Sequence, residues 1–197
     1  MKKEDIVKCS LAITNMSSEM FNDALFYKEL ADETDNIFSK WRFYRSSLIN
    51  YCISVEVWIN KIVVKGLEKK DNLNEKEKKL FIILTEELEY LPSDINLSIN
   101  AKLKTYIPKL YDFEIRKGSD LYVAIENYKE ITRFRNKIIH YSQGNYEKVY
   151  NTDELKSCIE NAPKNIEILF DEMYKLSGKL DEIGYPNWVK DRKSREI

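Results

Sequence analysis

The one histidine of this chain, His140, stands in the segment RFRNKIIHYS at residues 133–142. In a helix, residues four and seven positions apart share a face, so Asn136 and Arg133 fall on the same side as His140. An imidazole that titrates at about pH 6.5 can take up or release a proton. A guanidinium can bind a phosphate through paired hydrogen bonds. The spacing therefore predicts a cationic, hydrogen-bonding ridge, with Lys129 and Lys137 beside it.

Arg135 falls on a different side of the same predicted helix. It is in register with the apolar stripe that should face the core, formed by Leu121, Ile125, Tyr128, Ile131 and Ile138. An arginine in such a stripe is costly unless it has a partner or opens onto a cleft. Glu56 is equally out of place in the apolar stripe of residues 36–65, between Cys52 and Ile59. We therefore predict that Arg135 and Glu56 form a pair.

A structural interpretation of the same residues stays open at this point. A histidine near the carboxyl end of a helix interacts favourably with the helix dipole without doing chemistry. Strips of lysine and arginine are usually solvated surface. The Arg135–Glu56 pair could likewise join two helices without any catalytic role.

Hydrophobic periodicity predicts an all-α fold, because five glycines and four prolines leave few turns for a many-stranded sheet. Helices are expected at residues 18–32, 36–65, 74–91, 120–142 and 152–178, with a short helix perturbed by Pro108 within 93–118. Asn74 and Glu77 form a capping-box pattern, and Gly66 should lie near a helix end. We expect a single-domain, up-and-down bundle of four to six helices.

Composition and net charge limit the kinds of partner, metal site and cell compartment that we expect for this chain. The net charge is −1, so any attraction to nucleic acid must come from a local basic patch. Three widely spaced cysteines and one histidine make a zinc site improbable and fit a reducing compartment. The longest apolar span, residues 48–64, is interrupted by Glu56 and Lys61, and no signal peptide is recognisable. We expect a cytoplasmic protein with no membrane partner.

The residues Arg135-Asn136-Lys137-Ile138-Ile139-His140, followed by Tyr141, resemble the signature of the HEPN superfamily. That signature is an arginine, often followed by asparagine, and then a histidine after four to six intervening residues, near the end of a helix in an all-α bundle. The resemblance covers residues 36–178. Residues 1–35 form an N-terminal helical extension of the same domain, and residues 179–197 form a C-terminal extension.

The resemblance implies a metal-independent endoribonuclease that acts as a homodimer, in which the two signature helices meet in one cleft. Such proteins are often toxins of toxin–antitoxin pairs or phage-defence proteins, so an antitoxin or regulatory partner is expected, and no cofactor or metal. By this resemblance His140 is the general acid/base, Arg135 stabilises the scissile phosphate, and Asn136 orients either the histidine or the phosphate. Glu56 and Arg133 are supporting residues of this site. Candidates for RNA contacts are Lys129, Lys137 and Tyr141.

Two alternatives remain at this stage. The chain could be a catalytically inactive HEPN-like module for dimeric interaction or nucleotide binding, or an unrelated helical protein-binding adaptor. Within the leading hypothesis, the family pattern favours Arg135 as the working arginine, whereas helical periodicity favours Arg133.

Overall fold

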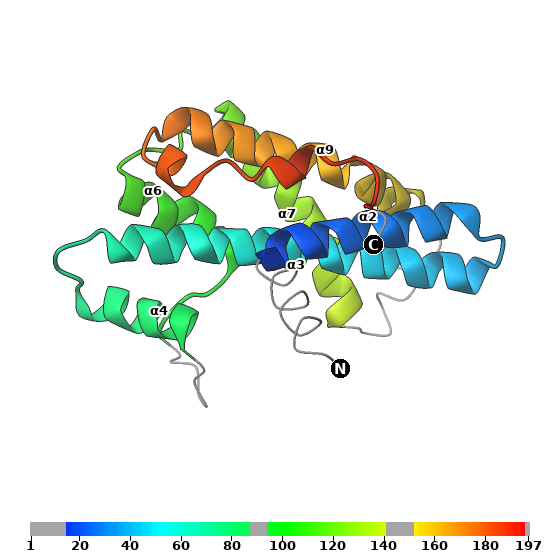
Figure 1. The fold of residues 1–197 in the computed structure, drawn as a ribbon, viewed down its shortest axis with the longest axis horizontal. Helices are drawn as coiled ribbons and strands as arrows, with labels where there is room; N and C mark the ends of the chain where they lie inside the picture. The colour runs from blue at the N-terminus through cyan, green and yellow to red at the C-terminus, as the bar shows by residue number, and fades with distance from the viewer. Residues whose placement is uncertain (1–14, 87–93, 141–151, 196–197) are drawn as a thin grey trace, which may run out of the picture. The chain divides into compact units, whose positions relative to one another are not determined.

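The computed structural model describes residues 15–86, 94–140 and 152–195, and the described residues are helical, with no strand among them. The longer helices are α2 (Met16–Glu33), α3 (Ile37–Glu68), α4 (Glu75–Thr85), α7 (Asp120–Ile139) and α9 (Asp153–Leu176). Short helical segments are α5 (Ile99–Ala101), η2 (Lys102–Tyr106), α6 (Ile107–Tyr111), η4 (Leu180–Ile183) and η5 (Asn187–Lys190). The predicted all-α class is confirmed (Figure 1).

The chain divides into two compact units, each made of segments that are far apart in the sequence. Unit 1 comprises residues 1–57, 127–167 and 187–197, and unit 2 comprises residues 58–126 and 168–186. Helices α3, α7 and α9 each contribute residues to both units. The division of the sequence at residues 35 and 178 rests on the family resemblance, and it stays a prediction.

In unit 1, α2 runs back alongside the first part of α3 (Figure 1). The Ser47 hydroxyl of α3 donates a 2.7 Å hydrogen bond to the backbone carbonyl of Ala24 in α2. The ring of Phe21 lies 5.3 Å from the rings of both Tyr51 and Trp188. The core of the unit is completed by buried residues of α3, α7 and α9, including Leu48, Val55, Tyr128, Ile131, Leu155, Ile159 and Ile166. This core fixes the part of α7 that carries the candidate site.

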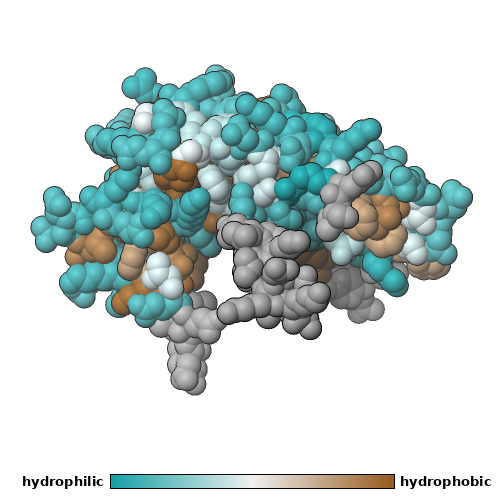
Figure 2. Space-filling view, viewed as in Figure 1, coloured by the Kyte–Doolittle hydropathy of each residue, from teal (hydrophilic) through white to brown (hydrophobic). Residues whose placement is uncertain are grey.

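Unit 2 is built around the second part of α3. Its buried residues include Ile59, Ile62, Val63, Leu103, Ile107, Leu121, Leu169 and Phe170. The Tyr111 hydroxyl donates a 2.8 Å hydrogen bond to the carbonyl of Ile62, and the Tyr174 hydroxyl donates one of 2.7 Å to the carbonyl of Gly184. Figure 2 shows mainly hydrophilic residues over the visible side of α9, as expected for a helix with one buried face.

The helix expected within residues 93–118 is present at 99–111, with a π-helical turn in its middle. Pro108 has no backbone N–H, so it cannot donate to the carbonyl four residues earlier. The preceding N–H, of Ile107, bonds instead to the carbonyl of Lys102, five residues back. The proline thus widens the helix locally and does not end it.

Two expectations from the sequence are confirmed. The capping box of α4 is present, because the Asn74 side chain accepts from the N–H of Glu77 and the Glu77 side chain accepts from the N–H of Asn74. Gly66, which we expected near a helix end, lies in the last turn of α3, two residues before Glu68. A Cβ at this position would lie 3.0 Å from the Leu110 Cβ and the Tyr111 ring. The close packing within unit 2 therefore leaves little room for a side chain at this position.

Helix α3 is the one helix in the described part of the chain that is long and apolar enough to cross a membrane. Of its most apolar 18-residue window, 56% is buried inside the protein. A buried core helix of a soluble protein has the same length and composition, and the fold is compatible with a soluble protein.

Candidate functional site on helix α7

The predicted ridge on α7 lies at the protein surface. Arg133, Asn136 and His140 are exposed, and Lys129 and Lys137 are half-buried. His140 directly follows the last residue of α7, and its backbone N–H donates a 2.8 Å hydrogen bond to the carbonyl of Asn136. The helical turn therefore continues to His140, and the register inferred from the sequence applies to it. Tyr141 lies outside the described residues.

Arg135 is turned into unit 1, as predicted, and donates a hydrogen bond to the Glu56 carboxylate of α3. The side chains of Arg135 and Glu56 are 23% and 33% exposed, so the pair is shielded from water over most of its surface. This contact joins α7 to α3 within unit 1. The predicted Arg135–Glu56 pair is confirmed.

The surroundings of this ion pair are largely apolar. The Cys52 thiol, one turn before Glu56 in α3, interacts electrostatically with the Arg135 guanidinium. Burial raises the pKa of Cys52 to about 12, although the positive charge of Arg135 acts in the opposite direction. Burial likewise raises the pKa of Tyr128 well above its ordinary value. Both groups are neutral at physiological pH, so the charges of Arg135 and Glu56 face mainly each other.

Arg133 has a different environment from Arg135. Its guanidinium lies 3.0 Å from the Glu130 carboxylate one turn earlier, and both side chains are more than half exposed. The Arg133 guanidinium carbon lies 5.8 Å from the centre of the Phe134 ring, and the Lys137 ammonium lies 4.8 Å from it. Exposed ion pairs of this kind are weak, so Arg133 can exchange Glu130 for another anion at little cost.

Helical geometry relates the two arginines to His140. His140 comes seven positions after Arg133, which places the two about 20° apart around the helix axis, whereas Arg135 lies about 140° from His140. The exposed surface therefore combines His140 with Asn136 and Arg133. Arg135 contacts α3 on another side of the helix.

Sequence reasoning missed Glu130, which belongs to this surface, and Phe134, which is buried beside it. The signal for Glu130 was present, because it precedes Arg133 by three residues, a spacing at which side chains of opposite charge meet on a helix. Phe134 is 6% exposed and supports the two cations beside it.

A shallow pocket of about 330 Å³ lies between α7 and α9 in unit 1. Its lining residues are mostly polar and comprise Asn127, Glu130, Ile131, Phe134, Glu154, Ser157, Cys158, Asn161 and Asn165. Glu130 belongs both to this pocket and to the ion pair with Arg133. The pocket is thus connected to the ridge through one carboxylate.

Within the described ranges, no group of three or more histidine, cysteine, aspartate or glutamate residues could hold a metal ion. Comparison with protein-family models, with curated proteins and with solved structures gives no significant match. The resemblance to the HEPN superfamily therefore depends on the motif at residues 135–140 and its position in a helix.

Proposed function

We propose that this chain is a HEPN-type, metal-independent endoribonuclease that acts as a homodimer, as a toxin or phage-defence protein. The observation that carries the proposal is the arrangement of exposed residues on α7. The motif histidine, an amide and a guanidinium all reach solvent on one side of the helix. An imidazole, an amide and a guanidinium are groups that can bind a phosphodiester.

The proposed reaction uses the chemistry of these side chains. The His140 imidazole takes the proton from a ribose 2′-hydroxyl, and the 2′-oxygen attacks the adjacent phosphorus. The bond to the 5′-oxygen breaks, and that oxygen receives a proton from an imidazole, supplied in the dimer by a second copy of the chain. An arginine stabilises the negative charge that develops on the phosphate. Asn136 orients the phosphate or the imidazole.

The identity of the working arginine is a testable part of the proposal. We favour Arg133 for contact with the phosphate, because it is exposed on the side of His140. We assign Arg135 the role of a positioning residue that fixes α7 to α3 through Glu56. Arg133→Met should then lower the cleavage rate by about 10²-fold or more, as loss of a charge-stabilising donor does, without lowering stability.

Arg135→Lys is the informative companion variant, because it keeps a positive charge near Glu56 and removes the planar guanidinium. If Arg133→Met cleaves RNA at the parent rate while Arg135→Lys loses activity and stays folded, the family assignment of Arg135 is the correct one. Melting temperatures of both variants identify any loss that is due to unfolding.

A second candidate is the catalytically inactive HEPN-like interaction module. It is supported by the ion pairs, because Arg135 is bound to Glu56 and Arg133 lies against Glu130. It predicts a dimer that cleaves no RNA at any protein concentration tested.

The test of the leading proposal is RNA cleavage in the presence of EDTA, with sedimentation or light scattering to measure the mass in solution. Active protein should be dimeric and should lose cleavage when His140 is replaced by alanine. A strict monomer without nuclease activity would favour the unrelated helical adaptor.

A further inference from the structure

Residues 187–195 lie on unit 1 and are held in two different ways. Trp188 and Val189, within the η5 turn, are buried, and the Trp188 ring lies 5.3 Å from that of Phe21 in α2. From Asp191 to Arg195 no side chain is buried. The 191–195 segment is therefore held by polar contacts, whereas its attachment point is held by apolar packing.

The most specific of these polar contacts joins Ser194 to Glu29 of α2. The backbone N–H of Ser194 donates a 2.7 Å hydrogen bond to one carboxylate oxygen of Glu29, and the Ser194 hydroxyl donates to the other. Both oxygens of one carboxylate are thus used by one residue. Next to it, the backbone N–H of Arg195 donates a 2.5 Å hydrogen bond to Oδ1 of Asn22, whose side chain is buried.

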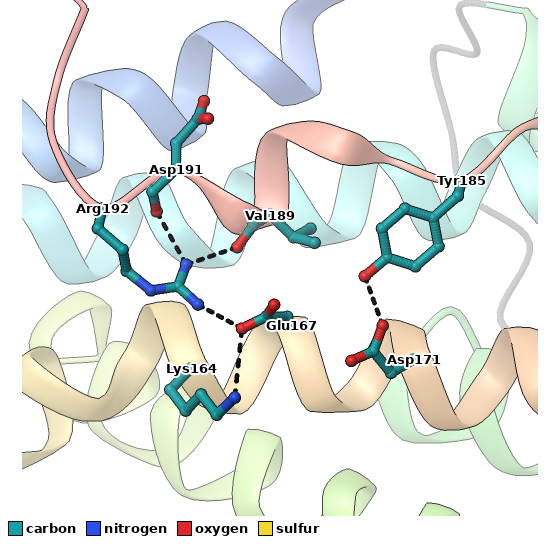
Figure 3. A network of polar contacts seen from close by, with 7 residues as sticks. All are labelled: Lys164, Glu167, Asp171, Tyr185, Val189, Asp191 and Arg192. Carbon is teal, nitrogen blue, oxygen red and sulfur yellow. Dashed lines mark hydrogen bonds and ion pairs between the residues drawn. The ribbon is translucent and has the colours of Figure 1, made fainter.

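The arginines of the segment add contacts at the edge. Arg192 bonds to the Glu167 carboxylate of α9 and donates to the carbonyls of Val189 and Asp191 at 2.8 and 2.9 Å (Figure 3). The Arg195 guanidinium contacts the Ser18 hydroxyl at 3.1 Å and the Glu19 carboxylate at 3.2 Å. Arg192 and Glu167 are 43% and 17% exposed, whereas Arg195 and Glu19 are 49% and 39% exposed, so the Arg195–Glu19 pair is the more solvated and the weaker of the two.

The surface of α2 under the segment is acidic, and the segment itself is basic. Between them lies an open groove of about 950 Å³, lined on the α2 side by residues that include Asp23, Glu29 and Glu33. Burial and the neighbouring Glu19 raise the pKa of Asp23, as expected where negative charges gather. The segment brings Arg192, Lys193 and Arg195 to this surface. Charge complementarity and the Ser194–Glu29 contact together explain why it docks there.

We propose that Ser194 is a phosphorylation site and that its modification releases the 191–195 segment from α2. The hydroxyl oxygen of Ser194 would attack the γ-phosphorus of ATP in the active site of a protein kinase. The bond between that phosphorus and the β–γ bridging oxygen breaks, ADP leaves, and the hydroxyl proton passes to the base of the kinase. Basic residues on both sides of Ser194 are the kind of charge pattern by which kinases select substrates.

The release follows from local electrostatics. Phosphorylation removes the hydroxyl donor and adds about 1.5 to 2 negative charges at neutral pH. In the docked state that charge would lie against the Glu29 carboxylate, within the acidic surface of α2. In the released state the phosphate can pair with Arg192, Lys193 and Arg195 of its own segment. The modified segment is therefore more stable when detached, and the ridge of α2 that carries Asn22 and Glu29 becomes accessible.

Limited trypsin digestion of the full chain measures this release, because cleavage after Arg192 and Lys193 requires a detached segment. Ser194→Asp should be cut about tenfold faster than the parent protein. Ser194→Ala should also be cut faster than the parent protein, but by a smaller factor, because its backbone N–H still donates to Glu29. Glu33→Gln is the matched control. Glu33 lines the same groove, and its replacement should leave the cutting rate unchanged.

Adding Glu29→Lys to Ser194→Asp should restore protection from trypsin through a new ion pair. Equal cutting of Ser194→Asp and parent protein, or no restoration in the double variant, would overturn the release mechanism.

The modification itself is tested with MgATP and a serine/threonine kinase that prefers basic substrates. Mass spectrometry should locate one phosphate at Ser194, absent from Ser194→Ala. Glu29→Gln, which weakens the docking of the segment, should be phosphorylated faster than the parent protein. Phosphorylated parent protein should then be cut by trypsin about tenfold faster than unmodified protein. Absence of phosphate at Ser194 in both proteins, or an unchanged cutting rate after phosphorylation, contradicts the proposal.

Discussion

Arg135 of α7 and Glu56 of α3 form an ion pair inside unit 1, 79 residues apart in the sequence. Two residues before Arg135, Arg133 points to solvent and lies against Glu130 of its own helix. One short segment thus contains an arginine that joins two helices and an arginine that is available to a ligand. This difference underlies our assignment of Arg133 to the phosphate and Arg135 to positioning.

The first prediction concerns the energy of the Arg135–Glu56 pair. Each single variant, Arg135→Met or Glu56→Met, should lower the free energy of unfolding by about 1–3 kcal/mol, because it leaves a partly buried charge without its partner. The double variant should lose less than the sum, with a coupling energy of about 0.5–3 kcal/mol. Urea unfolding of the four proteins measures this.

The matched control is the exposed pair on the same helix. Arg133→Met and Glu130→Met should show a coupling of about 0.5 kcal/mol or less, as for other pairs three residues apart on a helix. Equal coupling energies for the two pairs would contradict the distinction that we draw between the arginines.

The second prediction tests the close packing at Gly66. In Gly66→Ala the added Cβ meets the Leu110 Cβ and the Tyr111 ring at 3.0 Å, and crowding of this kind costs about 1–3 kcal/mol. Alanine regains at most about 1 kcal/mol through its helix propensity, so we expect a net loss of stability of up to about 2 kcal/mol. Gly178→Ala is the control, since nothing lies within 4 Å of a Cβ there. Thermal unfolding should show a lower melting temperature for Gly66→Ala alone.

The third prediction is a pH dependence in unit 2. Burial of Glu77 would raise its pKa, but hydrogen bonds from Lys70 and from the Asn74 backbone, with the charges of Lys70 and Lys109, hold the pKa below its ordinary value of 4.5. A carboxyl group whose pKa is lower in the folded than in the unfolded protein stabilises the fold at any pH above its pKa in the unfolded protein. This stabilisation is lost as the pH falls through its pKa in the folded protein. Glu77→Gln should therefore be less stable than the parent protein at pH 7, and the difference should shrink below about pH 4.5.

A cap variant provides the comparison for Glu77. Asn74→Ala removes the side-chain acceptor of the α4 cap but keeps the backbone N–H that binds Glu77. It should cost about 1 kcal/mol at both pH 7 and pH 4, because the lost hydrogen bond does not titrate. A loss for Glu77→Gln that is the same at both pH values would contradict the role of the carboxylate charge.

The sequence predicted those features that depend on local spacing. The α4 cap follows from the four residues that form it, and the pairing of Arg135 with Glu56 follows from two charges that each interrupt an apolar stripe. Both inferences need no knowledge of how distant segments pack, beyond the fact that stripes face a core.

Other features depend on contacts between distant residues, which no local pattern contains. Gly66 lies in the last turn of α3, as its sequence position indicates, but the close approach of Leu110 and Tyr111 to it is not contained in any local pattern. The docking of Ser194 on Glu29 joins residues 165 positions apart, so the segment could equally be expected to be packed or frayed. Similarly, periodicity gave the directions of Arg133 and Arg135, and the structure added their partners, Glu130 and Glu56.

We propose that His140 on the exposed ridge of α7 catalyses RNA cleavage without a metal. The most direct measurement is the rate at which purified protein cleaves RNA in EDTA, compared between the parent protein, His140→Ala and the control Val123→Ala, an exposed position on the same helix. We predict that the parent protein and Val123→Ala cleave at the same rate and that folded His140→Ala does not cleave. Equal cleavage by His140→Ala and the parent protein, or no cleavage by a folded, dimeric parent protein, would contradict the account.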